Sequence, residues 1–189
     1  MRDAGAGMLV TNGPTGMMSV FVPVVVSDDR RTIRTHVARA NPWWRAIGEG
    51  ADVLGLFLAA SAYVSPSYYP SRFSDPGVVP TWNYVAAEVR GRAHVHDDTD
   101  WKASQIRQVT TRFEDGREPT WTVDDAPEDY IERQLRAIVG IEIDLISIDA
   151  KSKLSQNRPV LDGDSVRQHL SEGTPTEQNV AQRMSGDAK

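Results

Sequence analysis

The stretch IEIDLISIDAKSKLSQNR, residues 141–158, joins an alternating apolar run to a cationic segment. Apolar and polar side chains alternate from Ile141 to Leu145, and the alternation resumes one position out of phase at Ile146. Strict alternation is typical of a β-strand with one buried face, and a one-residue bulge shifts its phase. We therefore predict a strand with a bulge near Leu145, which redirects the chain just before the cations.

Three cations and four hydrogen-bonding side chains follow this strand between Lys151 and Arg158. Lysine and arginine bind carboxylates and phosphates, and an arginine fork can make two parallel hydrogen bonds to them. The same composition also suits an exposed polar loop. On this segment alone, an anion site and a solvated loop both remain open.

The other strands are indicated by apolar runs that end at turn residues. They are predicted at residues 8–12, 17–26, 32–37, 52–59, 81–89 and 93–97. Pro23 lies inside the second run, and because proline cannot donate to a ladder, that strand should be an edge strand or carry a bulge. Gly91 marks a turn or bulge between the last two runs.

Helices are predicted in the second half of the chain. The first begins at residues 98–99 and stops at Asp115-Gly116, the second has Asp125 as its N-cap, and the third spans residues 164–171. The apolar face of the first helix comprises Trp101, Ile106, Val109 and Phe113. Early hairpins followed by helical connections indicate an α+β fold, an antiparallel β-barrel with peripheral helices.

The chain has 189 residues, which is long enough for one domain with a sizeable core. We assign residues 1–171 to a single domain and residues 172–189 to a polar, flexible C-terminal tail. There is no cysteine, which excludes disulfides, thiolate nucleophiles and cysteine-ligated zinc or iron–sulfur centres. The chain also has no G-x-S-x-G, Walker or G-x-G-x-x-G motif, so nothing supports a hydrolase or a kinase.

The charge and hydropathy of the chain limit its partners. The net charge is −5, and the basic residues are scattered. Because nucleic-acid binding depends on neutralising phosphates, no nucleic-acid partner is expected. The longest apolar run, residues 53–60, is too short to span a bilayer, and no signal peptide is visible. We therefore expect a cytoplasmic protein with no membrane partner.

The histidines suggest two kinds of metal ligand. His36 ends a predicted strand, where it is either satisfied by a backbone carbonyl or acts as an axial metal ligand or a ligand-anchoring imidazole. His94 and His96 are two positions apart, so on a strand they share a face, as a two-histidine zinc site requires. No third histidine or well-spaced carboxylate accompanies them, and a solvated strand edge beside Asp97 explains the pair better.

Residues 61–80 form a long irregular segment rich in proline and aromatic residues, which is typical of a functional loop. With the following strand it supplies candidates for the wall of a flat pocket. These are Tyr63, Ser65, Ser67, Tyr68, Tyr69, Trp82 and Tyr84. Planar cofactors are held largely by apolar and aromatic walls, although ordinary core aromatics give the same pattern.

Four segments, taken together and in this order, resemble the PaiB family, described as FMN-binding negative transcriptional regulators. They are HVARANPW at residues 36–43, YVSPSYY at 63–69, VPTWNY at 79–84 and KSKLSQNR at 151–158. The resemblance implies the FMN-binding split β-barrel of flavin reductases and pyridoxamine oxidases. It also implies a homodimer with ligand sites at the subunit interface.

Two positions depart from the family pattern. Phe21 stands where many relatives have a histidine, and Arg72 with Asp75 stands where they have lysine and histidine. One PaiB-like branch, the piperazate synthases of nonribosomal peptide biosynthesis, binds haem b and converts N5-hydroxy-L-ornithine to L-piperazic acid with loss of water. The altered positions favour that haem-dependent N–N bond-forming enzyme. The alternative is an FMN-binding PaiB-type regulator or a flavin-dependent oxidoreductase.

The resemblance also implies site residues. His36 would be the axial haem ligand, and Lys153 and Arg158 would meet haem propionates or the carboxylate of the amino-acid substrate. The full set expected to contact the cofactor is His36, Arg39, Asn41, Ser65, Ser67, Tyr68, Tyr69, Trp82, Asn83, Lys153, Gln156 and Asn157.

Overall fold

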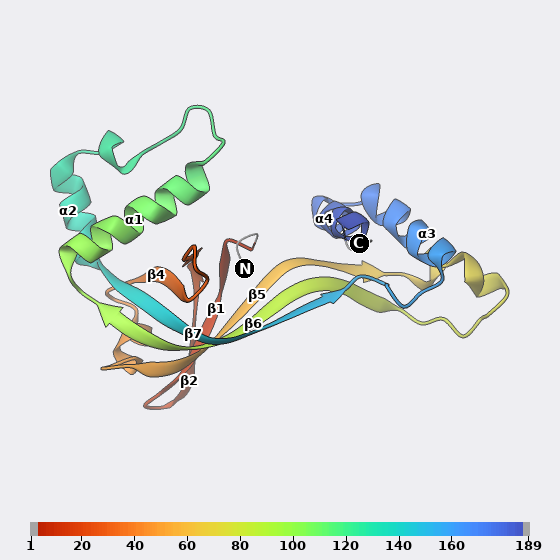
Figure 1. Ribbon diagram of the computed structural model, residues 1–189, viewed down its shortest axis with the longest axis horizontal. Coiled ribbons are helices and arrows are strands. Elements are labelled where there is room, and N and C mark those ends of the chain that lie inside the picture. The colour runs from red at the N-terminus through yellow and green to blue at the C-terminus, as the bar shows by residue number, and fades with distance from the viewer. Residues whose placement is uncertain (1–3, 187–189) are drawn as a thin grey trace. The chain divides into compact units, whose positions relative to one another are not determined.

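The computed structural model describes residues 4–186, and its strands form one seven-stranded antiparallel sheet (Figure 1). The strands are β1 (Ala6–Gly13), β2 (Gly16–Pro23), β3 (Val25–Val26), β4 (Thr32–Ala38), β5 (Ala51–Val64), β6 (Thr81–His96) and β7 (Ile138–Lys153). The α-helices are α1 (Thr99–Glu114), α2 (Glu128–Ala137), α3 (Val160–Ser171) and α4 (Pro175–Gly186). Short 3-10 helices are η1 (Pro42–Ala46), η2 (Pro66–Tyr68), η3 (Pro70–Phe73) and η4 (Val123–Asp125). The α+β class is confirmed.

The sheet curls into a barrel because its two ends are consecutive in the chain. The strand order is β2-β1-β5-β6-β7-β4-β3, yet only Val24 separates β2 from β3. Thr35 Oγ1 on β4 donates to the carbonyl oxygen of Pro23 at 2.6 Å, which ties the end of β2 to β4. Pro23 ends an edge strand, as its missing N–H predicts.

The chain divides into two compact units. The first holds the residues up to Phe57 together with Glu88–Asp149, and the second holds Leu58–Ala87 together with the residues from Ala150 onward. Strands β5, β6 and β7 contribute to both units. The sequence predicted one domain over residues 1–171, and this assignment stays a prediction beside the division into two units.

In the first unit, alternate strand positions point inward and form the core. Fully or nearly fully buried side chains include Leu9, Ile33, Val37, Val53, Phe57, Val89, Val139, Ile141 and Ile143. Helix α1 lies alongside β4 (Figure 1). Gly91 does not interrupt β6: a Cβ there would come within 2.5 Å of the Asp144 carbonyl oxygen, so the glycine permits close approach of β7.

Two details of the first unit bear on the sequence prediction. Helix α1 has the predicted bounds, but its fully buried side chains are Lys102 and Gln105, whereas Trp101, Ile106 and Val109 of the predicted apolar face are half-buried. The β4–β7 ladder keeps one register from Ile138 to Asp144 and ends before Leu145, so the bulge near Leu145 stays a prediction. Ile146 lies on the exposed face and is 72% accessible.

In the second unit, α3 and α4 cover one face of the strand ends (Figure 1). The buried cluster there comprises Ala60, Ala62, Val64, Tyr69, Leu154, Val166, Leu170, Val180 and Ala181. Helix α4 replaces the flexible tail predicted for residues 172–189, because Val180 and Ala181 are buried in this cluster. Residues 187–189 of that tail lie outside the described residues.

Within residues 4–186, no helix is both long enough and apolar enough to cross a membrane.

Candidate functional site

Lys153, the last residue of β7, is held at the start of β6. Its ammonium nitrogen donates to Thr81 Oγ1 and, at 2.9 Å, to the carbonyl oxygen of Trp82. Its side chain has no ion-pair partner between residues 4 and 186. Because an ammonium has three N–H donors, the protein uses two of them and leaves one for an anionic ligand.

Three further cations of the second unit, Arg72, Lys151 and Arg158, also have no carboxylate partner in the part of the chain that the structure describes. Arg72 Nη1 donates to the carbonyl oxygens of Ser67 and Tyr69, the latter at 3.2 Å. The guanidinium carbon of Arg158 lies 4.5 Å from the centroid of the Tyr69 ring. Cations without local carboxylates produce a positive potential that attracts anions.

An exposed aromatic pair lies next to Lys153 in the second unit. The rings of Tyr63 on β5 and Trp82 on β6 meet edge to face, with centroids 6.2 Å apart, and they are 45% and 55% accessible. Tyr63 alternates with the buried Ala62 and Val64, so it points away from the cluster under α3 and α4. This face therefore offers an aromatic surface, and the backbone carbonyl of one of its residues, Trp82, holds the Lys153 ammonium.

The loop after β7 is fixed from below by buried hydrogen bonds. Ser155 has a left-handed backbone, with φ of 65°, and its hydroxyl donates to Asn83 Oδ1 at 3.1 Å. The Asn83 amide in turn donates to Met184 Sδ at 3.7 Å. Gln156 bridges the loop, because its Oε1 accepts from Leu154 N and its Nε2 donates to the Ser152 carbonyl. These hydrogen bonds fix the backbone on both sides of Lys153.

The YVSPSYY segment mostly builds the turn that carries Arg72. Ser65 caps η2 by accepting from the Ser67 N–H at 3.1 Å, and the two serine hydroxyls are 2.7 Å apart. The Tyr68 ring stacks on His169 with centroids 4.4 Å apart. Tyr69 is fully buried in the cluster of the second unit, and its hydroxyl has no hydrogen-bond partner there.

His36 lies in the first unit, on the side of β4 that α1 covers. Its Nδ1 is 3.0 Å from Gln105 Oε1. Burial lowers the pKa of His36, and the bond to Gln105 offsets part of that effect. A neutral imidazole that donates from Nδ1 keeps the lone pair of Nε2 for another partner.

Arg39 and Asn41 hold the local structure of the first unit. Arg39 binds the Asp97 carboxylate and also donates to the carbonyl oxygens of Arg136 and Ile138, at 2.8 and 3.1 Å. Hydrogen bonds from Arg39 and the buried Lys102 keep the pKa of Asp97 well below its usual range. Asn41 Oδ1 accepts from Trp43 N and so caps η1.

The expected cofactor residues thus fall into two groups. His36, Arg39 and Asn41 belong to the first unit, and the others belong to the second. Within the second unit, the structure brings Lys153 to Trp82, Asn83 to the loop after β7, and Arg158 to Tyr69. Gln156 and Asn157 are exposed in that loop.

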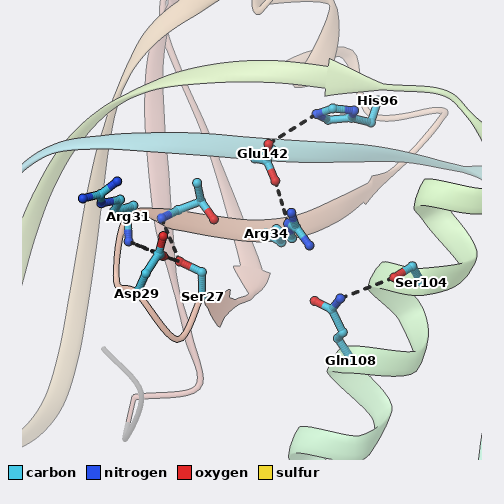
Figure 2. A network of polar contacts seen from close by, with 9 residues as sticks. Ser27, Asp29, Arg31, Arg34, His96, Ser104, Gln108 and Glu142 are labelled. Atoms are coloured by element: carbon cyan, nitrogen blue, oxygen red, sulfur yellow. Dashed lines mark hydrogen bonds and ion pairs between the residues drawn. The ribbon is translucent and has the colours of Figure 1, made fainter.

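The histidine pair on β6 faces carboxylates on β7. His94 Nε2 is 3.3 Å from Asp144. His96 Nε2 is 3.9 Å from Glu142, which also accepts from Arg34 at 2.6 Å (Figure 2). The described residues contain no group of three or more histidine or acidic side chains that could hold a metal ion. The zinc alternative therefore gains no support.

Sequence reasoning missed the residues that support the candidate ligands. Thr81 receives Lys153, Ser155 fixes the loop, and Gln105 fixes His36. Asp162 on α3 is buried and accepts from the N–H and hydroxyl of Ser71, at 3.0 and 2.6 Å. Thr81 and Ser155 lie inside the family-like segments, so the resemblance could have pointed to them. No motif or spacing in the sequence marks Gln105 or Asp162.

Comparisons with known proteins identify the family of the chain. Residues 1–147 match a family model described as "Putative FMN-binding domain". The "Protease synthase and sporulation protein PAI 2" of Bacillus subtilis is 34% identical over 192 residues, which covers 100% of this chain and 90% of that protein.

Solved structures share the fold at low sequence identity. The "FAD and Heme binding protein" of Mycobacterium smegmatis superposes with a TM-score of 0.59 at 17% identity, covering 80% of this chain and 67% of the other. The "Flavocytochrome Anf3" of Azotobacter vinelandii gives a TM-score of 0.54 at 10% identity, covering 79% and 62%. The fold is the split β-barrel of FMN-binding proteins. The chain belongs to the family of this FMN-binding domain, as a homologue of the PaiB protein of B. subtilis.

Proposed function

We propose that the chain binds FMN on the exposed face formed by Tyr63, Trp82 and Lys153. The observation that carries the proposal is that Lys153 is held beside an exposed aromatic pair without any carboxylate partner in the described chain. FMN combines a planar ring system with an anionic phosphate, which matches an aromatic surface with a free cationic donor.

The family match supports this ligand, since it covers residues 1–147. A bound flavin supplies hydride or single-electron transfer, and the protein supplies binding and orientation. Lys153 would donate to an anionic or carbonyl oxygen of the cofactor, while Thr81 and the Trp82 carbonyl keep its ammonium in place. A flavin-dependent oxidoreductase and a PaiB-type regulator would both use this site.

We also propose that the protein is a homodimer. Three apolar side chains form a row across neighbouring strands of the first unit, since Met8 pairs with Phe21 on β2 and with Leu56 on β5. Phe21 is 67% accessible and Leu56 is 43% accessible. Contiguous exposed apolar side chains are typical of an interface, and a second copy of the chain would bury them.

A haem-dependent piperazate synthase is the second candidate, and the environment of His36 favours it. Metal-binding histidines usually donate their other ring N–H to a fixed oxygen, as His36 Nδ1 can to Gln105 Oε1. Haem iron would supply a Lewis acid for the N–O bond of N5-hydroxy-L-ornithine.

The visible spectrum of the purified protein separates the two candidates. Flavin absorption bands support FMN binding, whereas an intense Soret band that is lost in His36→Ala supports haem. Incubation with N5-hydroxy-L-ornithine tests the second candidate further, because it requires a product lighter by one water. A protein that shows neither band after reconstitution with FMN or haem b contradicts both.

A further inference from the structure

Met184 lies in the last turn of α4, and we propose that it is an oxidation site that controls the position of Lys153. Its thioether sulfur accepts a hydrogen bond from Asn83 Nδ2 at 3.7 Å. Asn83 lies on β6, is fully buried, and directly follows Trp82. Conversion of Met184 to its sulfoxide would therefore change a contact beneath the aromatic pair and Lys153.

The buried amide of Asn83 depends on this sulfur. Among residues 4–186, no other acceptor receives Asn83 Nδ2, while Asn83 Oδ1 accepts from the Ser155 hydroxyl at 3.1 Å. A thioether is a weak acceptor, and a buried amide donor that loses its acceptor is destabilising. The two ends of the Asn83 side chain thus join α4 to the loop after β7.

The same asparagine supports Lys153 from two directions. The Lys153 ammonium donates at 2.9 Å to the Trp82 carbonyl oxygen, which belongs to the planar peptide group that also contains the Asn83 N–H. Ser155, which is bonded to the Asn83 side chain, lies two residues after Lys153. A displacement of Asn83 would therefore move an acceptor of the ammonium and the backbone that carries it.

Met184 is the one methionine between residues 4 and 186 that belongs to the second unit. Its side chain is half-buried at the edge of the apolar cluster there, so part of it is open to solvent. The other described methionines are Met8, Met17 and Met18, on β1 and β2 of the first unit. An effect of oxidation within the second unit can therefore be assigned to Met184.

The oxidant we propose is hydrogen peroxide. Its O–O bond breaks, one oxygen forms the S=O bond with Met184 Sδ, and the other leaves as water, so the sulfur is oxidised and the peroxide is reduced. The sulfoxide is polar and carries an additional oxygen. Because a close-packed interior resists added atoms, that oxygen should push the last turn of α4 away from Asn83 and loosen the loop after β7.

Peroxide treatment of the ligand-free protein, followed by peptide mass spectrometry and hydrogen exchange, tests the proposal. The peptide that contains Met184 should gain one oxygen. The amide of Leu154, which donates to Gln156 Oε1, should then exchange about tenfold faster or more, as the loss of one hydrogen bond implies. Met184 that stays unoxidised after the exposed Met17 has reacted fully, or an exchange rate that oxidation at Met184 leaves unchanged, overturns the proposal.

Two leucine variants assign the effect to one sulfur. Met17→Leu is the matched control, because it removes an exposed sulfur of the first unit and should keep the faster exchange after peroxide. Met184→Leu lacks the proposed site, and peroxide should leave its exchange rate unchanged although Met17 is oxidised. Equal acceleration in Met184→Leu and in the unchanged protein overturns the proposal.

A second measurement does not depend on variants. In a nitrogen-15 spectrum of the unchanged protein, the side-chain amide resonances of Asn83 should shift on oxidation of Met184. They should return after treatment with a methionine sulfoxide reductase, which restores the thioether. Asn83 resonances that do not move when Met184 is oxidised overturn the proposal.

The effect on ligand binding rests on the proposed function. If FMN binds beside Lys153, oxidation of Met184 should weaken its binding about fivefold or more, and the reductase should restore it. Met184→Leu should bind FMN equally before and after peroxide. FMN affinity that oxidation of Met184 leaves unchanged overturns its control of Lys153. Faster exchange of Leu154 in a protein that does not bind FMN would end the proposed function and support the oxidation site.

Discussion

At the scale of single residues, His36 should make stability depend on pH. Burial lowers its pKa in the folded state, whereas the unfolded chain titrates near the free value of about 6.5. As the pH falls below that value, the unfolded state binds more protons than the folded state, so folding becomes less favourable. Asp97 does not confound this range, because its lowered pKa affects stability only in more acidic solution.

Denaturant midpoints at about pH 7 and about pH 5 measure this effect. The unchanged protein should be less stable at the lower pH, and His36→Gln should reduce the difference. If the variant loses as much stability as the unchanged protein, His36 is not the group responsible.

Asp97 should be the acidic residue of the first unit with the largest effect on stability. It binds Arg39 and also Lys102, which is 3% accessible. Asp97→Asn removes a charge partner from a buried ammonium, and we expect a loss of about 2 kcal/mol in the free energy of unfolding. Asp124→Asn breaks the exposed pair with Arg107 and serves as control, with an expected loss below about 1 kcal/mol. Similar losses in the two variants would contradict this role.

At the scale of elements, α4 is part of the folded second unit. Val180 is fully buried, and truncation to alanine should lower the free energy of unfolding by about 1 to 2 kcal/mol. Gln182→Ala changes an exposed position of the same helix and should have little effect. Chemical denaturation of both variants measures the difference, and equal stability would mean that α4 does not pack as described.

Helix α4 also shows what the sequence could have predicted. Thr174, Pro175 and Glu177 form a capping-box signature, and the structure contains its hydrogen bonds, with Glu177 Oε2 accepting from Thr174 N at 2.7 Å. The signal was missed because only Val180 and Met184 supply large apolar side chains to the helix. By contrast, the strands lie where alternation and turn residues predicted them, although residues 81–89 and 93–97 form one strand and residues 17–26 form two. The bounds of α1 are confirmed.

The candidate site could be predicted only in part. The four family-like segments identified the family and several residues that do meet, such as Lys153 and Trp82. They did not reveal that Tyr69 and Asn83 are buried, because burial depends on α3 and α4 packing from later in the chain. The contact between His36 and Gln105 joins residues 69 positions apart, and no local pattern encodes it.

At the scale of the whole molecule, the apolar row of the first unit should mediate dimerisation. Leu56→Asp places a charge beside Met8 at the end of the apolar row, and we expect it to convert a dimer to a monomer because an unpaired charge would be buried at the interface. Trp121→Asp, at an exposed aromatic residue outside the row, is the control. Sedimentation or light scattering measures the mass. A monomeric unchanged protein, or a Leu56→Asp variant that stays dimeric, would contradict the proposed interface.

The most direct test of the proposed function is titration of the protein with FMN, followed through the flavin fluorescence. Lys153→Met should weaken FMN binding about tenfold or more, because it removes a charge-assisted hydrogen bond and keeps the length of the side chain. Lys151→Met, which removes an exposed cation two residues earlier on β7, should change the affinity less than about threefold. Tight binding that Lys153→Met abolishes and Lys151→Met preserves would support the Lys153 site. Absence of FMN binding to the unchanged protein, or equal effects of the two substitutions, would contradict it.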